Sequence, residues 1–245
     1  MRDDAFTSLA GLDRDTRRAP AFDRTLARVE TYFDQTATKT WEQLTSDAPV
    51  SRIRQTVRAG RDRMRDVMLR RLPADLTGLR VLDAGCGAGQ MTVELARRGA
   101  EVVAVDISPS LVNIAELRLP EEFQKQVTFR AGDMLDPALG HFDHVIAMDS
   151  LIYYTAEDIA ASLLRLCART GSEIVFTVAP RTKLLMSMWY AGKLFPRTDR
   201  SPVMIPHAPQ TLARVAEAQG LSRAVVPVER VTSGFYISQA MEVRK

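Results

Sequence analysis

A glycine-rich turn at Gly85, Gly87 and Gly89 contains the residue types that point most directly to ligand chemistry. The turn follows the strand-like segment Val81–Ala84 and precedes a helix-length segment, as expected where a strand leads into a helix. Glycines there let the backbone approach a ligand closely at the carboxyl edge of an α/β sheet. The spacing is Gly-x-Gly-x-Gly, and Gln90 occupies the position where a dinucleotide-binding turn would have its third glycine.

A carboxylate, Asp83, introduces this turn. A pyrophosphate group requires hydrogen-bond donors and positive potential, whereas a carboxylate suits a ligand that carries an ammonium and a sulfonium group. The charge of the turn therefore favours S-adenosylmethionine as the cofactor over a dinucleotide.

A second acidic residue, Asp106, ends the next predicted strand, where its carboxylate can accept hydrogen bonds from both ribose hydroxyls. Ile107 and Ser108 follow it and are expected to flank the adenosine. The simpler alternative for Asp83 and Asp106 is a pair of helix-capping carboxylates, but it leaves the glycine turn unexplained.

Two later strand ends complete the predicted cofactor site. After the third strand, Asp133 is expected to accept the adenine amino hydrogens and Met134 to pack on the ring, with simple core packing as the alternative for Met134. Asp149 follows the fourth strand and is assigned to the same site. Chemically suited residues at successive strand ends make a stronger argument than any one of them.

The elements that must position these residues alternate along the chain. Short Val- and Ile-rich runs alternate with helix-length segments, a pattern typical of βαβ units around a buried parallel sheet. We therefore expect an α/β fold with a mostly parallel, Rossmann-like sheet. The strands are predicted at Arg80–Asp83, Glu101–Asp106, Val127–Ala131, His144–Met148 and Ile174–Val178, and the helices at Gln90–Arg97, Ser110–Arg118, Ala156–Cys167 and Ala208–Gln219.

The two ends of the chain add to this core. Runs at Arg223–Val231 and Phe235–Val243, separated by Ser233-Gly234, predict an antiparallel C-terminal hairpin. Apolar residues at helical spacing predict an N-terminal helical arm over 21–72, after a disordered tail at 1–20. The cofactor-binding domain then covers 73–245 and contains an irregular insert at 181–207.

The region from about Leu79 to Val243 resembles the class I S-adenosylmethionine-dependent methyltransferases. More specific segments are similar to those of the magnesium-protoporphyrin O-methyltransferases of the bacteriochlorophyll pathway: Tyr32-Phe33-Asp34, Trp41, Ser51–Arg54, Val57–Arg61 and Gly234–Ser238. The resemblance implies methyl transfer to a propionate carboxylate of magnesium protoporphyrin IX, which gives its monomethyl ester and S-adenosylhomocysteine. The magnesium belongs to that substrate, so no protein-bound metal is expected.

An arginine-rich helix is expected to meet the acidic substrate. Arg54, Arg58 and Arg61 recur about one turn apart, and arginine forms bidentate pairs with carboxylates and phosphates. We expect these arginines to hold a propionate. Contact with acidic lipid and a solvated helix face are the alternatives.

The insert supplies apolar surface. Lys183–His207 includes Trp189 among several large apolar residues, enough to cover a flat macrocycle, and predicts a lid or a membrane-facing flap. A helix packed on the core is the alternative. His207 is a further candidate for a substrate contact, although a histidine after a proline in a loop is more often structural.

Two tyrosines are the candidate catalytic residues. A propionate is already ionised at neutral pH, so its methylation needs no strong base and depends on desolvation and alignment. Tyr32 in the arm and Tyr153 after the fourth strand are expected to reach the mouth of the pocket and position the acceptor. In many relatives within the wider class the position of Tyr153 looks like a His, which puts any acid–base role in doubt.

Composition limits the partners. A net charge of +3 suits anionic small molecules, an acidic membrane surface or nucleic acid. Nucleic acid is not expected, because the segment after the fourth strand lacks an Asp/Asn-Pro-Pro-aromatic turn. The two cysteines lack metal-ligand spacing and favour a reducing cytoplasm. Peripheral contact with the inner membrane surface, and with a magnesium chelatase subunit, is compatible with this reading. Another small-molecule acceptor and a noncatalytic tetrapyrrole carrier are the competing functions.

Overall fold

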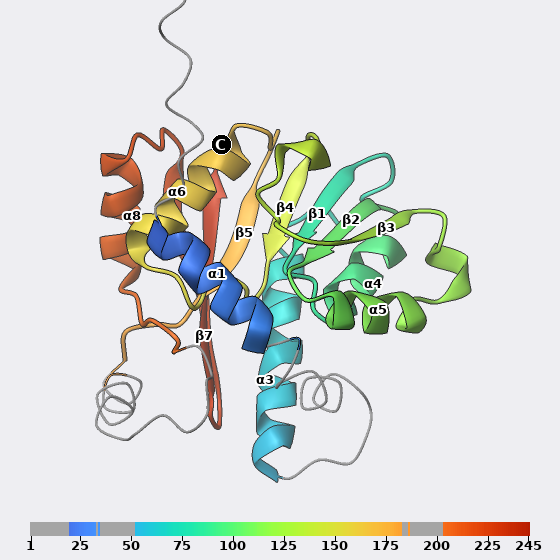
Figure 1. Cartoon of the computed structure of the whole chain (residues 1–245), viewed down its shortest axis with the longest axis horizontal. Coiled ribbons are helices and arrows are strands. Elements are labelled where there is room, and N and C mark those ends of the chain that lie inside the picture. Colours follow the sequence, from blue (N-terminus) through green and yellow to red (C-terminus); the bar gives the residue numbers. More distant parts are fainter. Residues whose placement is uncertain (1–19, 33, 35–51, 183–185, 187–202) are drawn as a thin grey trace, which may run out of the picture.

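Within the described residues, seven strands form one sheet in the order β3-β2-β1-β4-β5-β7-β6 (Figure 1). The computed structural model describes residues 20–32, 34, 52–182, 186 and 203–245. The strands are β1 (Arg80–Ala84), β2 (Glu101–Asp106), β3 (Val127–Ala131), β4 (His144–Ala147), β5 (Ile174–Val178), β6 (Ala224–Ser233) and β7 (Tyr236–Arg244). β1 to β5 are parallel, and β7 is antiparallel to both of its neighbours.

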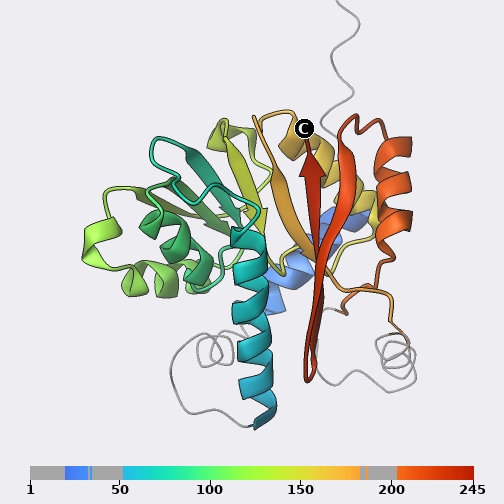
Figure 2. The same ribbon diagram turned by 180° about the vertical axis from the view of Figure 1, so that it is seen from behind.

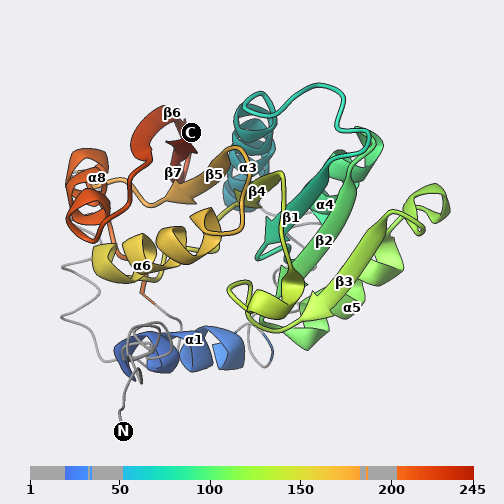
Figure 3. The same cartoon turned by 90° about the horizontal axis from the view of Figure 1, so that it is seen from above.

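Helices cover both faces of the sheet (Figure 3). They are α1 (Pro20–Tyr32), α3 (Arg52–Leu69), α4 (Gln90–Arg97), α5 (Pro109–Arg118), α6 (Ala156–Cys167) and α8 (Pro209–Ala218), together with short 3₁₀ helices at Glu121–Phe123 and Pro137–Leu139. α3 and α4 pack on one face, and α6 and α8 pack on the other. The predicted fold class, an α/β sheet with a helical arm and a C-terminal hairpin, is confirmed.

Successive residues of the central strands point to opposite faces of the sheet. In β1, Val81 packs with α3 and α4, whereas Leu82 packs with α6. In β2, Val102 and Val103 divide in the same way. Because each strand buries both faces, its sequence is a continuous apolar run with no alternating pattern.

The C-terminal hairpin extends the sheet beyond β5, with β7 between β5 and β6. Its turn lies against α3, since a Cβ added at Gly234 would lie 2.2 Å from Oγ1 of Thr56. The Ser233 hydroxyl also donates a hydrogen bond to the Thr56 carbonyl oxygen at 2.8 Å. α3 and the turn end of the hairpin therefore lie side by side (Figure 2).

The N-terminal arm is helical where it is described. In α1, Phe22 and Val29 are buried, and Phe22 stacks on Tyr154 with ring centroids 4.9 Å apart. α3 begins at Arg52. Residues 1–19 of the predicted tail, Trp41 and most of the predicted insert lie outside the described residues, whereas Pro20 is the first residue of α1. Among the described helices, none is long and apolar enough to cross a membrane.

Candidate active site

A cavity of about 1060 Å³, its open mouth included, lies at the carboxyl edge of the parallel strands. The loops after β1, β2 and β3 form one wall, and α1, α3 and the loop after β4 form the other. This edge of an open α/β sheet is where such folds bind nucleotides and other small molecules, so the cavity is the candidate ligand site.

The three glycines of the turn have two structural functions. Gly85, Gly87 and Gly89 all adopt left-handed φ values, of 84°, 54° and 83°. A Cβ at Gly85 would lie 2.4 Å from the Ser150 Cβ, and one at Gly89 would lie 3.0 Å from the Ala115 Cβ, so both glycines permit close packing. A Cβ at Gly87 would meet no described atom within 4 Å, although Gly87 lines the cavity. Gly87 therefore leaves the wall open to a ligand, and the turn fits S-adenosylmethionine.

Asp106 is held by the glycine turn and by its own loop. Its Oδ2 accepts a hydrogen bond from the Gly87 N–H at 2.8 Å, and its Oδ1 accepts one from the Ser108 N–H at 2.9 Å. Burial raises the pKa of this carboxyl group, and the backbone hydrogen bonds oppose the rise. A carboxylate has about four lone-pair sites, so two amides leave capacity for the ribose hydroxyls.

Asp83 is the more deeply buried carboxylate. Its Oδ2 accepts a hydrogen bond from the Thr92 hydroxyl at 2.6 Å. Burial, and to a smaller extent the charge of Asp106, raises the pKa of Asp83 to about 7, although the Thr92 hydrogen bond lowers it. A cationic ligand in the cavity would favour the ionised form. The charge of Asp83 is therefore suited to the ammonium group for which it was predicted.

The residues predicted to surround the adenosine follow β2 and β3. Ile107, Asp133 and Met134 line the cavity. Ser108 is fully buried, and its hydroxyl caps α5 by accepting a hydrogen bond from the Leu111 N–H at 3.3 Å. The structure thus brings the first three residues to one wall and assigns Ser108 a capping function beside it.

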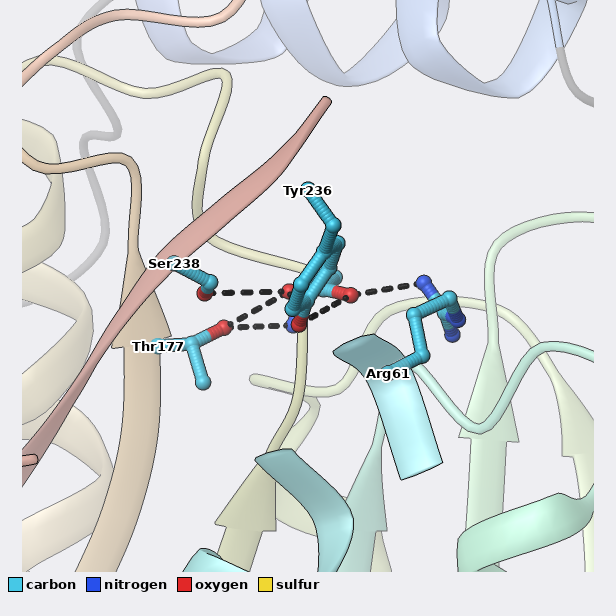
Figure 4. Close-up of polar contacts among 5 residues, drawn as sticks. Arg61, Thr177, Tyr236 and Ser238 are labelled. Carbon is cyan, nitrogen blue, oxygen red and sulfur yellow. Dashed lines mark hydrogen bonds and ion pairs between the residues drawn. The ribbon is translucent and has the colours of Figure 1, made fainter. Parts of the chain in front are cut away.

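Asp149 differs from the other predicted cofactor residues, because protein donors already surround its carboxylate. It lines the cavity and accepts hydrogen bonds from Arg61, Thr177 and Tyr236, with Ser238 at the limit of hydrogen-bond distance (Figure 4). The Arg61 contact is an ion pair of 2.6 Å. Asp149 was predicted to contact the cofactor because it lies at a strand end, and this network of donors was not predicted.

Both candidate catalytic tyrosines lie near this network. Tyr153 lines the cavity, and burial, followed by the charge of Asp149 and by Tyr32, raises its pKa far above the usual range. Arg61 opposes this rise. Tyr153 is therefore a neutral hydrogen-bond donor at physiological pH. Tyr32, the last residue of α1, is close enough to Tyr153 to contribute to this rise, but it is not among the described residues that line the cavity.

Two arginines of α3 line the cavity. They are Arg61 and Arg65, with side chains 15% and 16% exposed. The predicted Arg54 and Arg58 lie nearer the start of α3 and are not among the described residues that line the cavity. Arg65 also pairs with Asp62 at 2.7 Å. It was missed, although continuing the one-turn spacing beyond Arg61 would have found it.

The structure does not bring His207 to the cavity. The ring of His207 is buried and places Nε2 2.9 Å from the carbonyl oxygen of Tyr154, and the backbone N–H of His207 donates to the Ala179 carbonyl oxygen at 2.8 Å. Burial lowers the pKa of His207. These contacts are structural. Trp189, the other predicted substrate contact outside α3, lies outside the described residues.

One apolar part of the wall was not predicted. Phe22, Leu26 and Val29 of α1 line the cavity, and Tyr154 stacks on Phe22 beside them. Their helical spacing indicated an apolar face, but it could not indicate what that face would cover. Among the described residues, no group of three or more His, Cys, Asp or Glu side chains is placed to hold a metal ion.

The sheet order, the glycine turn and the two buried carboxylates define a class I S-adenosylmethionine-dependent methyltransferase. A family model for the methyltransferase domain matches residues 81–171, and one for the magnesium-protoporphyrin IX methyltransferase C-terminus matches residues 147–245. The chain is 62% identical over 218 residues to the magnesium-protoporphyrin O-methyltransferase of Rhodobacter capsulatus, covering 89% of this chain and 95% of that protein. It belongs to the magnesium-protoporphyrin O-methyltransferase family.

Comparisons with a more distant relative and with a solved structure indicate the same family. The magnesium-protoporphyrin O-methyltransferase of Synechocystis is 30% identical over 224 residues, covering 90% of this chain and 95% of that protein. A crystal structure of magnesium protoporphyrin IX methyltransferase from Synechocystis with bound S-adenosylhomocysteine superposes with a TM-score of 0.77 at 28% identity, covering 89% of this chain and 99% of that one. The predicted family is therefore confirmed.

Proposed function

We propose that this protein transfers the methyl group of S-adenosylmethionine to a propionate carboxylate of magnesium protoporphyrin IX, giving the monomethyl ester in bacteriochlorophyll biosynthesis. One observation carries the proposal: a single cavity joins the glycine turn and Asp106 to Arg61 and Tyr153. The close similarity to the Rhodobacter capsulatus methyltransferase supports the choice of acceptor.

The cofactor would be held by the wall that follows β1, β2 and β3. When bound, S-adenosylmethionine supplies an electrophilic methyl group on a sulfonium centre. Gly87 leaves room for it, Asp106 accepts hydrogen bonds from the ribose, and Asp83 provides negative charge for the ammonium group. Ile107 and Met134 contribute apolar surface beside the adenine.

The acceptor side of the cavity excludes water and orients a carboxylate. The propionate is ionised at neutral pH, so the protein has no proton to remove. Phe22 and Leu26 contribute an apolar wall that desolvates the carboxylate, which makes its oxygen more nucleophilic. Tyr153, neutral at this pH, donates a hydrogen bond to one carboxylate oxygen and leaves the other aligned for methylation.

The test is methyl transfer from labelled S-adenosylmethionine to magnesium protoporphyrin IX. We expect one labelled methyl ester per S-adenosylhomocysteine formed, and a parallel reaction with metal-free protoporphyrin measures the contribution of magnesium. Tight porphyrin binding without labelled ester would instead support the tetrapyrrole carrier. Label transferred only to another small acid or phenol would support a different acceptor.

We also propose a cytoplasmic location, with peripheral contact at the inner membrane surface and with a magnesium chelatase subunit that delivers the substrate. The support is chemical: the porphyrin is large and apolar, and α3 contains a high proportion of arginine. Cosedimentation with vesicles of anionic and of neutral lipid tests the first contact. A pull-down with purified chelatase subunits tests the second.

A further inference from the structure

The carboxylate of Asp149 lies at the centre of a polar network between three parts of the chain. Arg61 Nη1 of α3 donates to Oδ2 at 2.6 Å, and the Tyr236 hydroxyl of β7 lies 3.1 Å from Oδ1 and 3.2 Å from Oδ2. Thr177 of β5 donates to Oδ1 at 3.1 Å, and Ser238 of β7 lies 3.5 Å from the same oxygen. In Figure 4, Arg61 approaches from the side opposite Thr177 and Ser238.

These donors nearly saturate Asp149. A carboxylate offers about four lone-pair sites, and four protein side chains lie within hydrogen-bond distance. The Asp149 side chain is only 9% exposed. An arrangement of this kind suits a carboxylate that fixes its neighbours in place better than one that binds the cofactor or removes a proton.

The backbone of Asp149 is fixed as well. Its φ of 55° makes it the one described non-glycine residue in the left-handed region. Its N–H donates to the Thr177 hydroxyl at 2.7 Å. Aspartate and asparagine tolerate this conformation better than other residues, and such strain persists where surrounding contacts hold it.

Tyr236 reaches Asp149 because the hairpin packs tightly on α3. A Cβ at Gly60 would lie 2.6 Å from Cδ1 of Tyr236, so the absence of a side chain at Gly60 lets the ring approach the helix. Gly60 directly precedes Arg61. The contact that positions the tyrosine therefore also fixes the segment of α3 that carries the arginine.

Arg61 is the positively charged member of this network, and it lines the cavity beside Tyr153. Arginine binds carboxylates through a planar fork, so the direction of the fork decides which carboxylate it can hold. Asp149 also balances the charge of Arg61. A compensated guanidinium can orient a carboxylate oxygen without suppressing its nucleophilicity as strongly as an isolated cation would.

We propose that Arg61 is the receptor for a substrate carboxylate, and that Asp149, Tyr236 and Thr177 are positioning residues that fix its guanidinium group at the acceptor end of the cavity. The proposal rests on the proposed function, because it names the contact by which that site would recognise a propionate. It assigns Asp149 to the acceptor side of the cavity and replaces its predicted contact with the cofactor.

The first experiment compares a porphyrin that has two free carboxylates with the same porphyrin after both carboxylates are esterified. Magnesium protoporphyrin IX and its dimethyl ester are titrated by absorbance into protein saturated with S-adenosylhomocysteine. Arg61→Gln should weaken binding of the diacid about tenfold or more, as expected for a charged hydrogen bond, and change binding of the diester less than about twofold. Arg63→Gln is the matched control, because Arg63 lies on the same helix and pairs with Glu229 at an exposed site.

The second experiment tests the positioning residues by kinetics. Asp149→Asn keeps a residue that tolerates positive φ, and it should lower kcat about tenfold while the affinity for S-adenosylhomocysteine stays within about twofold. Tyr236→Phe should lower kcat by about threefold in the same way. Arg61→Lys preserves the charge but not the fork, so it should also lower kcat. This variant keeps the test informative if Asp149→Asn fails to fold.

The outcomes separate this inference from the proposed function. Wild-type protein that neither binds nor methylates magnesium protoporphyrin overturns the proposed function before any variant is compared. An active wild type whose Arg61→Gln variant loses diacid and diester affinity equally, or keeps both, overturns only this inference. Loss of S-adenosylhomocysteine affinity in Arg61→Gln with unchanged porphyrin binding would also overturn it, because Arg61 would then hold the cofactor.

Discussion

The two walls of the cavity are built in different ways. On the cofactor wall, short loops bring backbone amides to carboxylates at adjacent strand ends, as where the Gly87 N–H meets Asp106 at 2.8 Å. On the acceptor wall, Arg61, Asp149 and Tyr236 come from α3, the loop after β4 and the start of β7. The cofactor wall therefore depends on local backbone conformation, and the acceptor wall on the packing of distant elements.

A pair of glycine variants tests this dependence on backbone conformation, and it should give the largest effects. Gly85→Ala should lower the free energy of unfolding by about 3 kcal/mol, because φ is 84° and the new Cβ would lie 2.4 Å from that of Ser150. Gly87→Ala should cost only about 1 kcal/mol of folding, since its Cβ meets nothing within 4 Å in the described structure. Urea denaturation measures both values.

The same pair separates stability from binding. Gly87→Ala should weaken S-adenosylhomocysteine binding at least about tenfold, because its methyl group would project into the cavity. Isothermal calorimetry on the folded variant checks this. If Gly87→Ala binds the ligand normally, or destabilises the fold as much as Gly85→Ala, then the different functions assigned to the two glycines are wrong.

Removal of the Asp106 carboxylate should give the next largest effect. Asp106→Ala is expected to weaken S-adenosylhomocysteine binding about 100-fold, roughly 2.7 kcal/mol, because the ribose loses its acceptor and the Gly87 and Ser108 amides lose theirs. The control is Asp75→Ala, at an exposed position away from the cavity. Unchanged ligand affinity in Asp106→Ala would contradict the ribose contact.

The difference between the walls also explains what could be predicted from the sequence. The central strands were predicted to within about a residue, since a strand buried on both faces is a continuous apolar run and the glycine turn follows it directly. Asp83 and Asp106 could be predicted in the same way, because parallel strands end at one edge of the sheet. Local sequence therefore specifies most of the cofactor wall.

The acceptor wall could not be predicted to the same extent. The hairpin itself is a local pattern, but nothing in the sequence indicates that Gly60 and Gly234 bring it against α3, so the contact of Tyr236 with Asp149 was missed. The apolar spacing that includes Phe22 predicted a helix without predicting what it covers. Such contacts join residues far apart in the chain, and only the packed structure specifies them.

Substitution of Tyr153 should have a smaller effect on function. It tests whether a change on the acceptor wall can lower kcat without lowering the affinity for the cofactor product. Tyr153→Phe keeps the partly buried ring and removes the hydroxyl donor, so kcat should fall about tenfold, roughly 1.4 kcal/mol. The affinity for S-adenosylhomocysteine should stay within about twofold. Steady-state kinetics and calorimetry on the same preparation provide the comparison, and an equal loss in both would show that the two walls are not separable at this residue.

The smallest expected effects are those of pH on stability and on ligand affinity. They test the charge of Asp83 on the cofactor wall. The pKa of Asp83 is raised to about 7 from an ordinary value of 3.8. The folded protein therefore binds more protons than the unfolded chain between about pH 4 and 7, and this residue makes the fold less stable as pH rises through that range. The ammonium group of the ligand favours the ionised carboxylate, so ligand affinity should rise with pH through about 7 and binding should release a proton.

Calorimetry of S-adenosylhomocysteine binding in buffers of different ionisation enthalpy measures that proton directly. Thr92→Val keeps the buried shape but removes the hydrogen bond that lowers the pKa of Asp83, so the rise in affinity should move to higher pH. At pH 7 the variant should then bind the ligand severalfold more weakly than wild type, and the difference should shrink above about pH 8. If binding near pH 7 exchanges no protons in either protein, Asp83 is already ionised in the free protein and does not respond to the charge of the ligand.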